Sequence, residues 1–135
     1  MGGGRLGGCQ AGQRVNLVLD AGALIGVERH ERRTVALLAT RPPDSAVVIP
    51  AAVLAEVWRG GPQRLLSRLL RSGVVIDPLD EPTARAIGVV LRLSATTDVV
   101  DAQVVISARR HKAAIITSDP DDLRALDPAA SLQAI

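Results

Sequence analysis

The sequence predicts a three-layer α/β fold, in which helices cover both faces of a central parallel sheet of four to five strands. Short apolar runs alternate along the chain with amphipathic stretches of helical period. The runs lack the polar–apolar alternation of a strand with one wet face, so both faces of the sheet are expected to be covered. With 135 residues, of which 47% are hydrophobic and 22% charged, the chain is long enough to bury one core.

The first part of the chain is expected to contain two strands and two helices. Residues 15–19 are apolar and predict a buried strand, and residues 21–28 follow as the start of a helix. A charged patch then leads into a second helix, predicted over residues 34–39. Residues 42–45, with the sequence Pro-Pro-Asp-Ser, are typical of a loop. The second strand is predicted at residues 46–49.

Two further helices and a third strand are predicted in the middle of the chain. Pro50 suits the start of a helix over residues 51–59, which the Gly-Gly-Pro sequence at 60–62 ends. The next helix, residues 63–71, is amphipathic, and residues 74–76 predict the third strand. Its inward face is expected to hold Leu65, Leu66, Leu69 and Leu70, and its outward face Arg64, Arg68 and Arg71.

The last part of the chain completes the alternation. Residues 81–93 and 98–110 have helical patterns, and the second of these helices ends in an Arg-Arg-His-Lys cluster that its dipole favours. Residues 114–117 predict a fourth strand, and Asp119 has the position of an N-cap for a helix that begins at a proline. Residues 132–135 are a candidate for a short fifth strand.

Composition and the termini limit the class of protein. Residues 1–14 are rich in glycine and are expected to be a disordered tail, which leaves residues 15–135 as the folded domain. The single cysteine, Cys9, cannot form an internal disulfide, and with two histidines it cannot build a structural zinc site. No apolar run is long enough to cross a bilayer, so a cytoplasmic protein that does not bind membranes is expected. The absence of Phe and Tyr, which leaves Trp58 as the one aromatic residue, excludes base-stacking platforms of the RRM or OB type.

Acidic residues fall at the places where a parallel sheet forms its ligand site. Asp20 ends the first strand, and Asp119 follows the fourth strand by one residue. The carboxyl ends of parallel strands face one crevice, so both side chains are expected there. Glu56 lies on the inward face of a very apolar helix, and Asp98 and Asp101 share a face at the start of another. These acids are therefore expected to gather in one cleft.

Each acid also has a purely structural interpretation. Asp20, Asp98 and Asp119 have the positions of helix caps, and Glu56 can pair with a nearby arginine. Caps and pairs do not explain why several acids converge with no lysine among them, because buried like charges repel unless a cation joins them. Oxygen ligands suit Mg²⁺ or Mn²⁺, and the chemistry of such a site is metal-assisted phosphodiester hydrolysis.

Four motifs together resemble the PIN domain, and most of all the VapC toxins of bacterial toxin–antitoxin pairs. They are LDAGALI at 19–25, LAEVWRG at 54–60, DVVDA at 98–102 and ITSDPDDL at 116–123. The resemblance covers about residues 15–135. It implies a parallel sheet flanked by helices, a Mg²⁺- or Mn²⁺-dependent endoribonuclease, a cognate antitoxin partner and a homodimer.

The resemblance also assigns roles to residues. The acidic quartet of the family, expected to bind metal and act in catalysis, matches Asp20, Glu56, Asp101 and Asp119. Secondary acidic or phosphate-positioning roles match Asp98, Thr117, Asp121 and Asp122. The sequence departs from the family at Leu123, where an aromatic residue is frequent, and this is interpreted as a packing substitution.

The basic residues are candidates for contacts with an RNA backbone, although each group can equally be a solvated helix face. They are Arg64, Arg68, Arg71, Arg109 and Arg110. A partner peptide is expected in a groove between the helices of residues 21–39 and 51–71. It is expected to pack on the leucine-rich run 65–70, with Val53, Val57 and Trp58 nearby, and to insert an Arg or Lys towards the acidic quartet. The alternative is that these leucines are internal.

Two other functions remain open from the sequence. One is a PIN-like module that binds RNA or protein without cutting, against which the intact acids argue. The other is an aspartate-nucleophile phosphotransferase. Asp20 after a strand fits that chemistry, but Gly22 stands where a second Asp is expected and no lysine follows a later strand.

Overall fold

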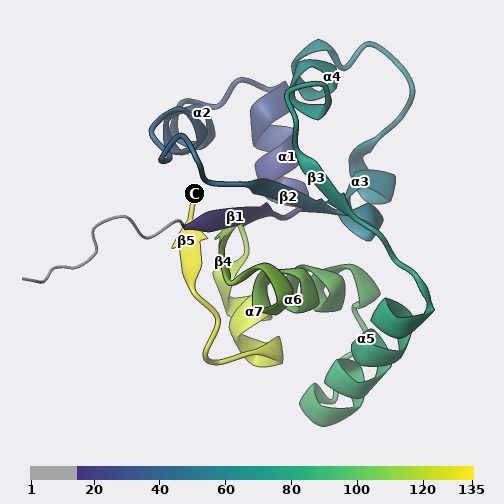
Figure 1. Cartoon of the computed structure of the whole chain (residues 1–135). Coiled ribbons are helices and arrows are strands. Elements are labelled where there is room, and N and C mark those ends of the chain that lie inside the picture. Colours follow the sequence, from purple (N-terminus) through teal and green to yellow (C-terminus); the bar gives the residue numbers. More distant parts are fainter. Residues whose placement is uncertain (1–14) are drawn as a thin grey trace, which may run out of the picture.

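A computed structural model describes residues 15–135 and contains one five-stranded sheet, in which every pairing is parallel (Figure 1). The strands are β1 (Asn16–Leu19), β2 (Val47–Pro50), β3 (Val75–Asp77), β4 (Ala113–Thr117) and β5 (Leu132–Ala134). Their order across the sheet is β3-β2-β1-β4-β5. The predicted parallel sheet is confirmed, with the larger of the two expected strand numbers.

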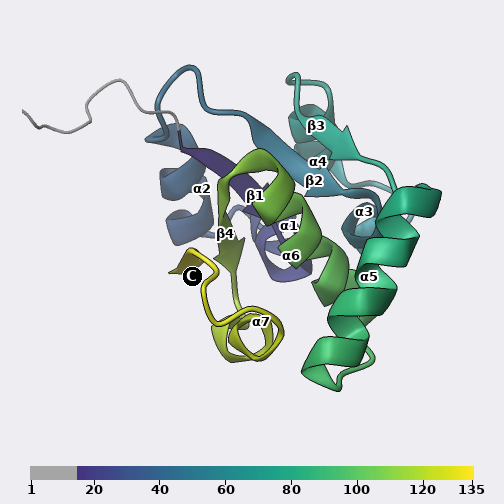
Figure 2. The same cartoon turned by 60° about the horizontal axis from the view of Figure 1, so that its bottom comes forward.

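Helices cover both faces of the sheet, as the continuous apolar strands require. The helices are α1 (Ala21–Glu28), α2 (Arg32–Ala39), α3 (Ala51–Val57), α4 (Arg64–Leu70), α5 (Glu81–Ser94), α6 (Val99–His111) and α7 (Pro120–Leu126). α1, α2 and α4 lie on one face, and α5, α6 and α7 lie on the other (Figures 1 and 2). α3 follows the carboxyl end of β2 and contacts both α1 and α6.

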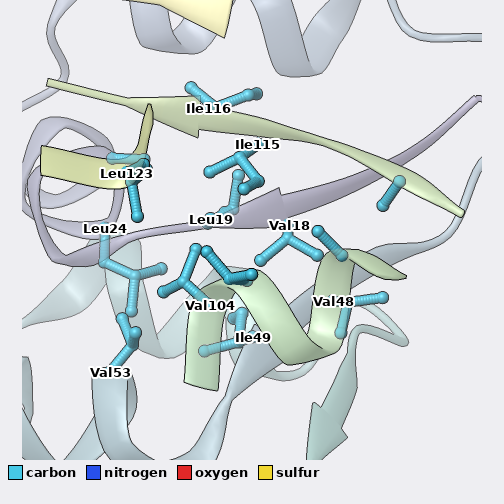
Figure 3. Packing of buried hydrophobic residues seen from close by; sticks show 14 of the residues in the cluster. Val18, Leu19, Leu24, Val48, Ile49, Val53, Val104, Ile115, Ile116 and Leu123 are labelled. Carbon is cyan, nitrogen blue, oxygen red and sulfur yellow. The ribbon is translucent and has the colours of Figure 1, made fainter. Parts of the chain in front are cut away.

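The core is built from branched aliphatic side chains of the three central strands and the helices packed on them (Figure 3). β2 is buried at all four positions, and α6 crosses the sheet against β1, β2 and β4. Fully buried members include Val18, Leu19, Leu24, Val48, Ile49, Val53, Val104 and Ile115. β1 pairs with β4 through Leu19 opposite Ile116, which brings the carboxyl ends of these two strands side by side.

Most elements begin or end one or two residues away from the sequence-based prediction, as α2, α3 and β3 illustrate. α3 stops at Val57, because Trp58 has an extended backbone with ψ of 132°. α2 begins at Arg32 rather than residue 34. β3 lies one residue further along, since its register places Asp77 opposite Pro50. The expected tail, residues 1–14, lies outside the described residues. Within residues 15–135, every helix is too short or too polar to cross a membrane.

Candidate active site

Asp20 is held at the carboxyl end of the central strand, where α1 begins. Its backbone N–H donates to Ile116 O at 3.2 Å, which prolongs the pairing of β1 and β4 by one step. Its Oδ1 accepts from the N–H of Ala23 at 2.9 Å, so the side chain caps α1. Only 6% of the residue is exposed. The structural and the chemical interpretations of Asp20 are therefore compatible, because the second carboxylate oxygen is not used by the cap.

Asp119 reaches the same edge of the sheet from the neighbouring strand. β4 ends at Thr117, which is fully buried and whose Oγ1 accepts from the N–H of Asp119 at 2.8 Å. Asp119 precedes Pro120 as the N-cap of α7, but its side chain makes no capping hydrogen bond. The position expected for a cap is thus confirmed, while the carboxylate itself stays exposed and free of that role.

Asp98 and Asp101 stand together at the start of α6. Asp98 Oδ1 accepts from the N–H of Asp101 at 2.9 Å, which confirms Asp98 as a helix cap. Asp98 is exposed, whereas Asp101, one turn further into the helix, is partly buried. Asp101 therefore has the more inward of the two carboxylates.

The charges of these residues act on one another. Burial, followed by the negative charges of Asp98, Asp122, Asp20 and Asp119, raises the pKa of Asp101 to about 6. We call these five residues the acidic cluster. Burial also raises the pKa of Asp20, although the Thr117 hydroxyl and two backbone N–H groups work against that rise. Within residues 15–135, no Lys, Arg or His nitrogen lies within 4.0 Å of any carboxylate of the cluster.

A pocket of about 290 Å³ opens beside the acidic cluster. Its lining includes Asp98, Asp101 and Asp122, together with Thr96 and Thr97, which precede α6. Ala125 and Leu126 of α7 complete the lining. The pocket can receive a small polar group next to the carboxylates.

The acidic cluster fits a hard divalent cation by its chemistry. Carboxylate oxygens are the ligands that Mg²⁺ and Mn²⁺ prefer, and burial together with the neighbouring negative charges raises the pKa of Asp101. In the described part of the chain, the carboxylates are not yet close enough for three of them to hold one ion.

Glu56 differs from the expectation. It is exposed near the C-terminal end of α3, while Val53 and Val57 on the same helix are buried. It lines a separate pocket, with Arg29 and Arg59 among its neighbours, and is absent from the groups that raise the pKa of Asp101. The inward face of so short a helix is narrow, and the two valines fill it. The role of Glu56 at the site stays a prediction.

The remaining secondary acid, Asp121, also faces away from the cluster. It is exposed and pairs with Arg124 at 3.2 Å within the first turn of α7. Asp122, the other acid in that turn, lines the pocket instead. The structure thus separates two residues that the sequence treated as equivalent.

Gly22 permits the close approach of α1 and the turn after β4. A Cβ at this position would lie 1.9 Å from Ser118 Oγ and 2.8 Å from Ser118 Cβ, which no packing tolerates without movement. The glycine therefore lets Asp20 and the Thr117–Asp119 turn share one edge of the sheet.

The candidate RNA-contacting arginines fall into two groups. Arg64, Arg68 and Arg71 are exposed and line one polar pocket. Arg109 and Arg110 lie at the opposite end of α6 from Asp98 and are engaged in ion pairs, with Asp127 and Asp77 respectively, both at 3.0 Å. The second group has a structural role that the sequence did not indicate.

The sequence analysis missed the buried carboxylate of Asp77. It is 4% exposed, accepts from Ser107 Oγ at 2.6 Å and pairs with Arg110, so it fixes the edge strand β3 to α6. Gln103 adds to this attachment, because its Nε2 donates to the backbone O of Asp77 at 3.1 Å. The available signal was an acid directly after an apolar run, the same signal that marked Asp20.

The fold and the site define a three-layer α/β domain with an acidic cluster at the carboxyl edge of its sheet. The sequence model of the PIN domain matches residues 17–127, and the chain belongs to the PIN domain family. A comparison with curated proteins gives no match.

Solved structures with this fold include toxin–antitoxin proteins. A toxin–antitoxin complex from Klebsiella pneumoniae is 20% identical over 88% of this chain and 97% of that chain, with a TM-score of 0.68. VapBC2 from Rickettsia felis, bound to a promoter DNA fragment, has a TM-score of 0.68 at 13% identity over 90% and 99%. VapC20 from Mycobacterium tuberculosis, a sarcin–ricin loop cleaving toxin, has a TM-score of 0.58 at 17% identity over 74% and 87%. At these identities the likeness shows the fold.

Proposed function

We propose that the protein is a metal-dependent endoribonuclease and the toxin of a toxin–antitoxin pair. The observation that carries the proposal is the acidic cluster. Burial and the other four carboxylates of the cluster raise the pKa of Asp101. Among the described residues, no Lys, Arg or His pairs with any of the five. Membership of the PIN domain family supports a nuclease, and the likeness in fold to a cleaving toxin supports RNA as the substrate.

A Mg²⁺ or Mn²⁺ ion would be held by Asp20, Asp101 and Asp119. Glu56 would become a further ligand if its side chain moved towards the ion. Such an ion supplies Lewis-acid chemistry, since it makes water acidic enough to act as a nucleophile and offsets negative charge on the phosphate. The protein's own part is orientation. The cap on Ala23 N–H fixes Asp20, and Thr117 Oγ1 fixes the backbone of Asp119.

The structural observations bear unequally on the other two functions. A silent binding module has no need for a carboxylate such as Asp101, whose pKa is raised to about 6 by burial and by neighbouring negative charges. A phosphotransferase that uses Asp20 as nucleophile needs a second acid two residues on. Gly22 stands there, and it leaves no room for a side chain.

An antitoxin is the partner that the comparisons favour, because two of the matched structures are complexes of this kind. The groove we assign to it is a mainly apolar pocket of about 350 Å³ between α1, α2 and α4. Its apolar lining includes Val27, Val35, Leu38, Leu65 and Leu69.

One expectation about this groove is wrong. Leu66 is fully buried in the core, so it cannot contact a partner, and the alternative of an internal leucine holds at this position. Leu65 and Leu69 are only partly buried and remain available. Trp58 is 40% exposed but does not line the groove. The homodimer stays a prediction, tested by the mass of the purified chain in solution.

The experiment for the proposed function is cleavage of total RNA by the purified chain. We expect cleavage with Mg²⁺ or Mn²⁺ and none after chelation. The matched pair of variants is Asp119→Asn, which should be inactive, and Asp44→Asn, an exposed loop residue that should keep full activity. Equal activity of both variants would contradict the assignment of the site.

A further inference from the structure

Residues 57–76 carry positive charge only. They include Arg59, Arg64, Arg68 and Arg71, and they contain no Asp or Glu. The chain as a whole has 14 acidic and 16 basic residues, so an uninterrupted stretch of one sign is a distinct feature. A stretch of one sign in a chain that also carries an acidic cluster gives the surface regions of opposite charge.

Three of these arginines form one face of α4 and its end. Arg64, Arg68 and Arg71 are spaced at i, i+4 and i+7, and all three are exposed. Within residues 15–135, no carboxylate oxygen lies within 4.0 Å of their nitrogens. Like charges at this spacing repel each other and destabilise an isolated helix. An anion bound between them would remove that repulsion.

The three guanidinium groups frame a pocket of about 380 Å³. The rest of its lining consists of Gly61, Pro62, Gln63 and Ser67. Arginine presents a planar fork of N–H donors that matches two oxygens of a phosphate. The pocket therefore offers charge and donors suited to a tetrahedral oxyanion.

The pocket wall is held in place by bonds that leave the arginines free. Gln63 Oε1 accepts from the N–H of Arg59 at 2.9 Å, and Gln63 Nε2 donates to Val57 O at 3.0 Å. Glu28 Oε1, from α1, accepts from the N–H of Leu66 at 3.0 Å and anchors the start of α4. A fixed wall lowers the entropy lost when a ligand binds.

This pocket is continuous with the surface around Glu56. A neighbouring pocket of about 240 Å³ is lined by Glu56, Arg29, Arg59 and Gln63. Gln63 lines both pockets, so one surface runs from Glu56 to the face of α4. Trp58, the only aromatic residue of the chain, lies in the same segment and is 40% exposed.

We propose that the pocket framed by Arg64, Arg68 and Arg71 binds a backbone phosphate of single-stranded RNA and so anchors the strand on the α4 side of the site. This inference rests on the proposed ribonuclease function and adds the path of its substrate. RNA is favoured over an acidic protein segment because Trp58, an exposed aromatic side chain in the same segment as these arginines, can stack on a base.

The test uses Trp58 emission, which is free of other aromatic signals because the chain has no Phe or Tyr. A single-stranded RNA is titrated into the Asp20→Asn protein without divalent metal, so that no strand is cut. Asn keeps the oxygen that caps α1, so the variant is expected to fold. The pocket variant is Arg64→Gln/Arg71→Gln. We leave Arg68 unchanged because it also lines the groove between α1, α2 and α4.

We expect the pocket variant to bind RNA at least tenfold more weakly. The slope of log K against log salt should become shallower by about 0.7, because the loss of one contact with a single-strand phosphate removes about that much. The matched control is Arg85→Gln/Arg92→Gln on α5, which removes the same charge and should change affinity less than twofold. A polyglutamate peptide of equal charge is titrated in parallel.

Four outcomes overturn the inference. An equal loss in pocket variant and control assigns binding to net charge, and no loss in either leaves the pocket without a role in RNA binding. A loss confined to polyglutamate assigns the pocket to an acidic protein segment. If the Asp20→Asn protein with all its arginines binds no RNA, the proposed ribonuclease function fails as well. The other three outcomes overturn only the role of the pocket.

Discussion

At the scale of the residue, Asp20 shows why capping and catalysis need not exclude each other. A carboxylate has two oxygens, and the cap on Ala23 N–H uses Oδ1. Asp98 uses Oδ1 in the same way but is exposed, and it lies at the rim of the pocket. The sequence predicted both residues at the correct positions. Burial, which separates their roles, depends on packing and could not be predicted from spacing.

The variants Asp20→Asn, Asp101→Asn and Asp119→Asn should each abolish RNA cleavage while the protein stays folded. Each removes a charge that the proposed ion needs, but none leaves a cavity. Asp98→Asn should reduce the rate less, because asparagine keeps the capping oxygen. Cleavage rates together with circular dichroism check this. A dead Asp98→Asn beside an active Asp101→Asn would reverse the assignment of the two residues.

The stability of the metal-free protein should depend on pH through Asp101. Its pKa is about 6 in the folded protein against an ordinary value of 3.8, so the folded state holds the proton more tightly. The contribution of Asp101 to the free energy of unfolding therefore falls as the pH rises from 4 to 7. After discounting for solvent screening at a half-exposed group, the loss is about 1 kcal/mol.

Urea unfolding in EDTA measures this dependence. Asp101→Asn should match the wild type at pH 4 and exceed its stability at pH 7, whereas Asp44→Asn should follow the wild type throughout. An Asp101→Asn protein that is less stable than the wild type at pH 7 would show that this carboxylate is not strained.

Arg110 should contribute to stability and not to RNA binding. Its guanidinium pairs with the buried carboxylate of Asp77 at 3.0 Å, and it also donates to Thr83 Oγ1 at 3.1 Å. Arg110→Gln should lower the free energy of unfolding by about 1–2 kcal/mol, because Asp77 loses its main counterion. Denaturant titration and the RNA titration above check the two parts. A loss of RNA affinity with unchanged stability would instead support Arg110 as a residue that contacts the RNA backbone.

At the scale of the element, packing between α1 and the turn after β4 sets the geometry of the site. Gly22→Ala should destabilise the protein by about 1–3 kcal/mol and reduce cleavage, because the new Cβ would meet Ser118. Gly88→Ala on α5 is the matched control. No atom lies within 4 Å of its added Cβ, so it should stabilise by up to about 1 kcal/mol. Similar effects of the two substitutions on stability would contradict this account of the packing.

The elements themselves could largely be predicted from the sequence, because buried parallel strands are short and continuously apolar. The end of α3 could not. Gln63, six residues on, donates to the free carbonyl of Val57, and this contact ends the helix two residues before the Gly-Gly-Pro sequence does. The exposure of Glu56 follows from the same early end. A contact between a side chain and the backbone across a loop produces no periodic pattern in the sequence, so the end of α3 could not be predicted from it.

At the scale of the whole molecule, the proposed binding surfaces and the proposed catalytic site lie on different parts of the sheet. The face with α1, α2 and α4 carries the apolar groove and the arginine pocket, and the acidic cluster lies at the carboxyl edge between the layers. Leu69→Glu should weaken binding of an antitoxin encoded beside the gene by tenfold or more, since a charge would enter the groove.

The control for the groove is Leu93→Glu on α5. This leucine is 72% exposed and lies on the other side of the sheet, so antitoxin binding should be unchanged. Pull-down with each variant and thermal unfolding check the pair. Undiminished binding by a folded Leu69→Glu protein would place the antitoxin elsewhere.

The most direct measurement of the central claim is the chemistry of the cut RNA ends. Attack by water, as the acidic cluster and a divalent ion would support it, leaves a 5′-phosphate and a 3′-hydroxyl. We predict these ends, formed with Mg²⁺ or Mn²⁺ and absent in EDTA. Products that end in a 2′,3′-cyclic phosphate, or undiminished cleavage in EDTA, would contradict it.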